Sequence, residues 1–217
     1  VPSITPSISR QDGSSVEVSM SALAGMVEGD DGLSSLSEII DLYGDWIDTQ
    51  AKRTDIPNKL VGAKDRHIAS CTRALTRMEV GLRYLETDPL AYRAFQLANR
   101  AVLLQQLAAG GDRRLIKYDR TSRRYFFPEP YKEPDPKDVP PGRGNWRPFQ
   151  IAFLLTCLQS TADPSTDERE TVELLWFPTG GGKTEAYLGL TAFSIFLRRL
   201  KDPNDVGVHV LMRYTLR

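Results

Sequence analysis

Hydrophobic residues recur every three or four positions between residues 33 and 108, which is the spacing of one buried helix face. This pattern predicts three successive helices. The first starts with a capping box, in which Ser35 and Glu38 would satisfy backbone N–H groups that have no partner within the helix. The second carries a heptad seam of apolar residues from Val61 to Leu85.

The third predicted helix starts after Asp88, which would cap it, with Pro89 at the first helical position. Its apolar face extends from Leu90 to Ala108, and two glycines at residues 110 and 111 end it. Because the connections between the three helices are short, we expect an antiparallel helical unit. The heptad seam also suits docking on another subunit, so both internal packing and a docking role stay open.

The segments around these helices differ in composition. Residues 1–32 are rich in Ser, Gly and Asp and are expected to form a flexible or partly ordered N-terminal segment. Residues 113–127 contain two short alternating runs, which predict a β-hairpin at the end of a helical accessory domain over residues 33–127. Residues 128–145 are rich in proline, which neither continues a helix nor donates to a sheet, so we expect an extended linker there.

A different pattern begins after this linker. The elements predicted there are, in order, a helix over residues 149–158, a buried strand over 172–177, a helix over 183–200 and a second buried strand over 206–212. Strand, helix and strand at this spacing form a βαβ unit, which opens a parallel sheet. We therefore expect an α/β plus α-helical protein, in which residues 146–217 start a P-loop domain.

The segment between the first predicted strand and its helix has the features of a phosphate-binding loop. Glycines at residues 180, 181 and 182 would let backbone N–H groups surround a phosphate, and the following helix adds the positive end of its dipole. Lys183 would place its charge on the β- and γ-phosphate oxygens, and the Thr184 hydroxyl would bind Mg²⁺. The sequence thus predicts a triphosphate and Mg²⁺ site with Lys183 and Thr184 as its catalytic residues.

Phe177 stands where the general phosphate-loop pattern has its first glycine. Residues 178–184 instead resemble motif I of superfamily 2 helicases and translocases, and residues 146–150 resemble the Arg-Pro-aromatic-Gln element upstream of motif I. A glutamine amide has a donor and an acceptor side by side, so Gln150 would pair with adenine N6 and N7. The resemblance implies ATP as the nucleotide and a set of binding residues: Arg147, Gln150, Thr179, Gly180, Gly181, Gly182, Lys183, Thr184 and Glu185.

Two further segments have residues that suit nucleic acid. Residues 210–217 lie where superfamily 2 proteins have motif Ia, so Arg213, Thr215 and Arg217 would contact a phosphate backbone. An ordinary polar strand end would have the same residues. The basic and aromatic residues of the predicted hairpin likewise suit either a strand of nucleic acid or packing against the core.

Residues 146–217 resemble the large helicase-related subunit of DISARM anti-phage systems, on the strength of segments 146–150, 174–190 and 210–217. This resemblance implies a RecA-like domain that engages DNA with ATP, in complex with a second defence-system subunit. Only 33 residues follow Thr184, and the acidic motif that hydrolysis needs is not among them. We therefore expect a fragment of a larger protein, which alone would bind nucleotide without hydrolysing it.

Composition narrows these possibilities only slightly. Lys plus Arg and Asp plus Glu number 28 each, so any nucleic-acid contact must come from a local patch. Cys71 and Cys157 lack the spacing of a zinc site or disulfide framework, which fits the reducing cytoplasm. No apolar run approaches the roughly 20 residues that a membrane span needs, so no membrane contact is expected. A helical protein- or DNA-docking module and a P-loop NTPase outside the helicases stay open as alternatives.

Overall fold

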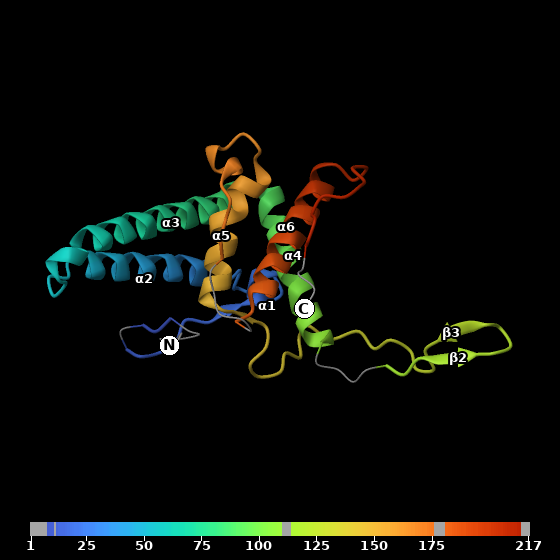
Figure 1. The fold of residues 1–217 in the computed structure, drawn as a ribbon. Coiled ribbons are helices and arrows are strands. Elements are labelled where there is room, and N and C mark those ends of the chain that lie inside the picture. The colour runs from blue at the N-terminus through green and yellow to red at the C-terminus, as the bar shows by residue number, and fades with distance from the viewer. Residues whose placement is uncertain (1–7, 11, 110–113, 176–180, 214–217) are drawn as a thin grey trace.

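The computed structural model describes residues 8–10, 12–109, 114–175 and 181–213, which are mostly helical (Figure 1). The long helices are α2 (Leu33–Ala51), α3 (Val61–Thr87), α4 (Pro89–Ala108), α5 (Pro148–Ala162) and α6 (Lys183–Lys201). The short ones are α1 (Met20–Leu23) and two 3-10 turns, η1 (Asn58–Leu60) and η2 (Asp167–Glu170). The strands are β1 (Val18–Ser19), β2 (Lys117–Asp119), β3 (Arg124–Phe126) and β4 (Asn145–Trp146). They form two separate antiparallel pairs, β1 with β4 and β2 with β3.

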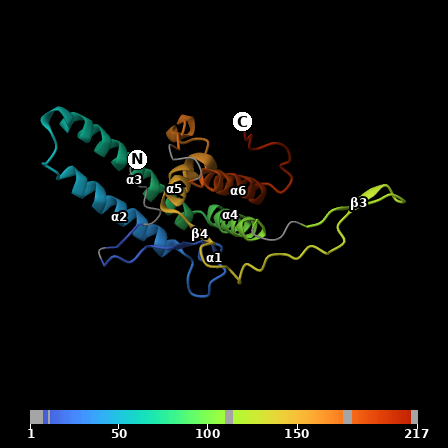
Figure 2. The same ribbon diagram turned by 60° about the horizontal axis from the view of Figure 1, so that its bottom comes forward.

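Helices α2 and α3 lie side by side and project from the body as a long pair (Figures 1 and 2). Helix α2 begins at Leu33, directly after Gly32 in the left-handed conformation, so the predicted capping box of Ser35 and Glu38 is wrong. The earlier start places Ser35 inside the first turn, where its hydroxyl donates to the Gly32 carbonyl at 2.7 Å. Glu38 instead forms an ion pair with Arg10.

The heptad seam of α3 packs mainly inside the protein. Met78, Leu82 and Leu85 in its second half are buried, whereas Val61 at the outer end is 39% exposed. Further out, the Leu75 side chain packs against Gly44 of α2. Internal packing therefore occupies the part of the seam nearest the body.

Helices α3 and α5 cross at very close range. A Cβ built on Gly81 of α3 would stand 2.0 Å from the carbonyl oxygen of Leu155 of α5, a distance that no side chain can occupy. Glycine is thus required at this position by the approach of the two backbones. The crossing fixes α5 against the helical pair.

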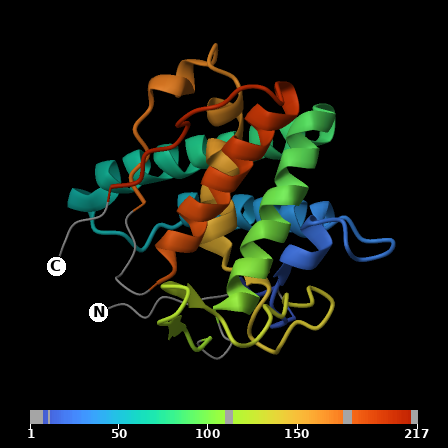
Figure 3. The ribbon, with the colours of Figure 1, turned by 90° about the vertical axis from the view of Figure 1, so that its right-hand side faces the viewer.

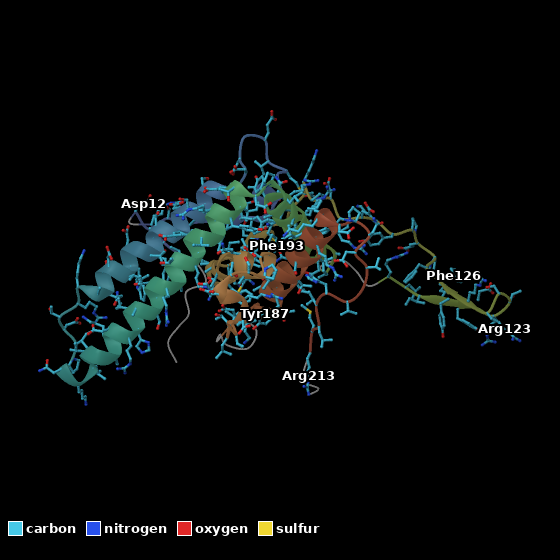
Figure 4. All side chains as sticks on the ribbon, turned by 90° about the horizontal axis from the view of Figure 1, so that it is seen from above. Asp12, Arg123, Phe126, Tyr187, Phe193 and Arg213 are labelled. Atoms are coloured by element: carbon cyan, nitrogen blue, oxygen red, sulfur yellow. The ribbon has the colours of Figure 1, made fainter. Side chains whose placement is uncertain are left out.

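The core lies where α3, α4, α5 and α6 meet. Helices α4 and α6 pack alongside each other across α5 (Figure 3), and Phe193 of α6 lies at the centre of the body (Figure 4). One buried cluster includes side chains from both sides of the proline-rich segment, among them Leu85, Phe95, Leu103, Ile151, Leu155, Leu158 and Phe193. Residues before and after that segment therefore pack as one body. None of the described helices is apolar over a stretch long enough to cross a membrane.

Part of the N-terminal segment is ordered against this body. Val18 of β1 pairs with Trp146 of β4, and the α1 side chains Met20 and Leu23 are fully buried. The Met20 N–H donates to the Gly144 carbonyl at 2.8 Å. The segment therefore helps to position the chain just before α5.

The two strands of the predicted βαβ unit have no regular secondary structure in the described residues 171–175 and 202–213. Several of their apolar side chains lie in solvent, with Val172 92% exposed and Val208 86% exposed. The second segment is still attached to α6, because His209 Nε2 lies 2.7 Å from Ser194 Oγ and Asp205 pairs with Arg198. The RecA-like parallel sheet stays a prediction.

Candidate nucleotide-binding site

A pocket of about 560 Å³ lies at the N-terminal end of α6, where the predicted phosphate loop meets the end of α4 and the start of α5. Ligand pockets for small molecules commonly have volumes of several hundred Å³. The residues that line it are Gln105, Gln106, Ala109, Gly142, Arg143, Asn145, Arg147, Gln150, Gly182, Lys183, Thr184 and Glu185.

Trp146 anchors the chain on the α5 side of this pocket. Its side chain is 4% exposed, and its Nε1 donates to the Asn99 carbonyl oxygen Oδ1 at 2.6 Å. The Asn99 amide donates in turn to the Phe95 backbone carbonyl at 2.8 Å, so both polar groups of this buried residue are bonded. On the other side, Gly189 of α6 leaves room for the indole, because a Cβ there would stand 2.9 Å from it. The buried Trp146 therefore fixes the position of the chain directly before residues 147–150.

Arg147 and Gln150 hold the described part of the phosphate loop. The Gln150 side chain is 4% exposed, and its Nε2 donates to the Gly182 carbonyl at 2.7 Å. Its Oε1 accepts from the Arg147 N–H at 2.8 Å, which satisfies a backbone donor at the start of α5. The Arg147 guanidinium donates to the Gly181 carbonyl at 2.8 Å. Two of these bonds, from Arg147 to Gly181 and from Gln150 to Gly182, join the start of α5 to the loop, and we call this pair the loop clamp.

The loop end itself requires glycine. Gly182 has φ of 87°, a left-handed conformation that side chains disfavour. A Cβ on Gly182 would also stand 2.7 Å from Gln150 Nε2 and 3.2 Å from Glu185 Oε2. Helix α6 begins at the next residue, Lys183, so the positive end of its dipole faces the pocket.

The polar groups of the pocket fit a nucleoside triphosphate. Arg143, Arg147 and Lys183 bring positive charge to the pocket lining, which also includes the exposed Thr184. Glu185 supplies the opposite sign, and its Oε2 is buried with no hydrogen-bond partner among the described residues. Donors suited to phosphate and one carboxylate side chain thus line the same cavity.

Most of the predicted nucleotide-binding residues are brought together. Arg147, Gln150, Gly182, Lys183, Thr184 and Glu185 line the pocket, and Gly181 is attached to it through Arg147. Thr179 and Gly180 lie outside the described residues, as do Thr215 and Arg217 of the predicted motif Ia. Arg213 is described and exposed at the end of the segment after α6 (Figure 4).

The wall from α4 and the end of the proline-rich segment was not predicted. Arg143 donates to the Gln106 backbone carbonyl at 3.0 Å, and the Gln106 side chain accepts from the Gly144 N–H at 3.1 Å. No periodicity or motif marks these residues, because their role depends on which helix ends meet in space.

Neither cysteine belongs to this pocket. Cys71 and Cys157 are both free, and burial raises the pKa of the Cys157 thiol to about 12. Within the described ranges, no group of three or more His, Cys, Asp and Glu residues is arranged to hold a metal ion. Mg²⁺ binding by Thr184 therefore stays a prediction.

No protein-family profile matches the chain. A search of characterised proteins finds similarity to the DISARM protein DrmA of Bacillus paralicheniformis, with 34% identity over 193 residues. The match covers 85% of this chain and 16% of the length of that protein. It extends well beyond the predicted phosphate loop and takes in much of the helical region as well. The similarity supports a DrmA-like relationship for this chain.

Proposed function

We propose that this chain carries the nucleotide-binding part of an ATP-dependent superfamily 2 helicase or translocase that acts on DNA in DISARM anti-phage defence. The observation that carries the proposal is the loop clamp. It joins Arg147 and Gln150 to Gly181 and Gly182, which lie 34 and 32 residues further along the chain. The two segments that resemble motif I and its upstream element in superfamily 2 proteins thus meet at one pocket. The similarity to DrmA supports the role in defence.

The proposal gives specific roles to several residues of the pocket. The loop clamp holds the loop in place before nucleotide binds, so less conformational entropy is lost when the nucleotide binds. Lys183 places its ammonium on the β- and γ-phosphates, and the Thr184 hydroxyl is a ligand for Mg²⁺, which would neutralise phosphate charge. Arg143 and Gln106 close the outer wall from the side of α4.

Hydrolysis needs two further kinds of group, to which we assign none of the described residues that line the pocket. An acidic residue must orient the attacking water, and arginines must stabilise the charge that develops on the transferred phosphate. The relative is several times longer, since the match covers 16% of it, and we assign these groups to the rest of the protein. A second DISARM subunit is the proposed partner. The cytoplasm is the proposed compartment, because ATP is present there and reducing conditions keep Cys71 and Cys157 as thiols.

The test is a steady-state ATPase assay on the full-length protein with and without DNA. We expect DNA to stimulate hydrolysis and Lys183→Ala to abolish it, because the charge on the phosphates is lost. Lys59→Ala is the matched control, since Lys59 is exposed in η1 and lies outside the pocket lining. Activity that persists in Lys183→Ala would refute the role of the pocket.

The same assay separates two alternatives. ATPase activity that neither DNA nor RNA stimulates would favour a P-loop NTPase outside the helicases. Nucleic-acid binding with no ATPase activity would favour a docking module. Stimulation by RNA alone would exclude DNA as the substrate.

A further inference from the structure

Residues 114–141 form an extended arm that leaves the body beside the nucleotide pocket (Figures 1 and 2). The residues at its two roots, Ala109 on one side and Gly142 with Arg143 on the other, all line that pocket. Strands β2 and β3 form a hairpin in the outer part of the arm, with Tyr118 opposite Tyr125. The sequence left two interpretations of this hairpin, namely packing against the core or contact with nucleic acid.

The hairpin does not pack against the core. Every residue from 114 to 127 is exposed except Asp119, which is half-buried, and none belongs to the buried cluster. Tyr125 is 76% exposed and Phe126 is 45% exposed. Aromatic rings in a helical protein of this size are normally covered, so a row of exposed rings indicates a surface that another molecule covers.

The arm is nevertheless ordered by its own contacts. The Arg114 guanidinium stacks over the Phe127 ring, 4.0 Å from its centroid, and bonds the Glu129 carbonyl at 2.7 Å. The Tyr118 and Tyr125 rings lie 5.0 Å apart between centroids. These contacts support a hairpin that presents its side chains without help from the body.

The charge of the hairpin selects the kind of partner. Residues 114–127 contain five basic side chains, Arg114, Lys117, Arg120, Arg123 and Arg124, and one acidic one, Asp119. The Asp119 carboxylate accepts from Ser122 Oγ at 2.6 Å and from the Thr121 N–H at 2.9 Å, and these bonds lower its pKa. The Asp119 carboxylate therefore accepts hydrogen bonds within the turn. The hairpin has an excess of positive charge, although the net charge of the whole chain is zero. Arg123 and Phe126 extend from the hairpin into solvent (Figure 4).

Exposed rings lie beside Arg120, Arg123 and Arg124, for which the described residues provide no ion pair. This combination matches a nucleic-acid strand, which offers base faces for stacking and phosphates for pairing. Base faces are accessible only where the strands are separated. We propose that the hairpin binds single-stranded nucleic acid, with bases stacked on the paired rings of Tyr118 and Tyr125, which share one face, and phosphates paired with Arg120, Arg123 and Arg124. This binding goes beyond the proposed ATPase and does not require nucleotide.

The test measures fluorescence anisotropy of a labelled single-stranded DNA oligonucleotide with the full-length protein, free of nucleotide, over a range of salt concentrations. A variant with Arg120→Ala, Arg123→Gly and Arg124→Ala should weaken binding more than tenfold and lower the slope of log affinity against log salt by about 2. Glycine is chosen at position 123 because Arg123 has φ of 53°, so the turn is relieved while the charge is removed. Arg66→Ala with Arg73→Ala is the control, since both residues are exposed on α3 away from the arm.

A second variant tests stacking separately. Tyr125→Leu keeps an apolar side chain but removes the flat ring, and it should weaken binding between about 5- and 150-fold at unchanged salt slope. Wild-type affinity and slope in the arginine variant would overturn the proposal. So would loss of a protein partner in pull-down by either variant at unchanged oligonucleotide affinity, which would assign the arm to a protein surface. The oligonucleotide-binding test is independent of the proposed ATPase activity, because it is carried out without nucleotide. A protein without ATPase activity could therefore still bind the oligonucleotide through the hairpin.

Discussion

Replacing Gln150 by leucine tests whether the loop clamp or the nucleotide base uses the glutamine amide. In this structure both amide atoms are already bonded within the protein, to the Arg147 N–H and the Gly182 carbonyl. Leucine has a similar size but removes both bonds, and only the bond to Gly182 reaches the loop, so about 1 kcal/mol of loop stabilisation is lost. If this loss falls on the loop conformation that binds phosphate, affinity decreases roughly fivefold.

In the proposed function the loop contacts phosphates, which ATP and GTP share. Gln150→Leu should therefore weaken both nucleotides by the same factor and leave their ratio unchanged. Equilibrium titrations of the full-length protein with fluorescent ATP and GTP analogues measure this ratio. Gln159→Leu is the matched control, since it makes the same change about 13 Å further along α5.

Three results would refute this reasoning. A selective loss of ATP affinity at constant GTP affinity would show that Gln150 pairs with adenine, as the upstream element predicts. Unchanged affinity for both nucleotides would show that the loop keeps its conformation without the clamp. A fall in thermal stability without any change in affinity would also contradict it.

Two further predictions concern stability. Gly189→Ala should destabilise the protein by about 1–3 kcal/mol, because the new methyl group would stand 2.9 Å from the Trp146 ring. Gly62→Ala is the control on the exposed part of α3 and should stabilise the protein by about 0.5–1 kcal/mol. If urea denaturation gave equal effects for the two variants, the Trp146 indole would not be confined by Gly189. Asp88 caps α4 through backbone N–H bonds, chiefly with Ala91, that lower its pKa from 3.8. Its contribution should be complete above the unfolded pKa and disappear as the pH falls through the lower folded value, so Asp88→Ala should cost about 1 kcal/mol at pH 7. The variant should also reduce the dependence of the unfolding free energy on pH below about pH 4. An unchanged pH dependence in this acidic range would contradict the role of the cap.

Local chemistry explains what the sequence predicts well. Helix α4 starts at Pro89 with Asp88 as its cap because proline and a capping carboxylate act on neighbouring backbone groups only. The same holds for Gly182 and Lys183, where a left-handed glycine precedes a helix. Such signals are complete within a few residues, so they do not depend on the rest of the fold.

The less predictable features depend on long-range contacts. The capping box at Ser35 matches a general pattern, but Gly32 starts the helix earlier. The pocket wall at Gln106 depends on where the end of α4 meets the start of α6, which no local pattern encodes. Gln150 was predicted from its motif as a base-pairing residue, while the structure shows it bonded to Gly182.

The crossing at Gly81 has a mechanical consequence. Leu155 lies five residues after Gln150 on the same helix, about 8 Å along its axis. Since the α3 and α5 backbones touch there with no space for a methyl group, neither can slide without moving the other. A load applied at the outer tip of the α2–α3 pair would therefore reach α5 through this backbone contact. From the start of α5 it would pass to the predicted phosphate loop through the side chains of Arg147 and Gln150.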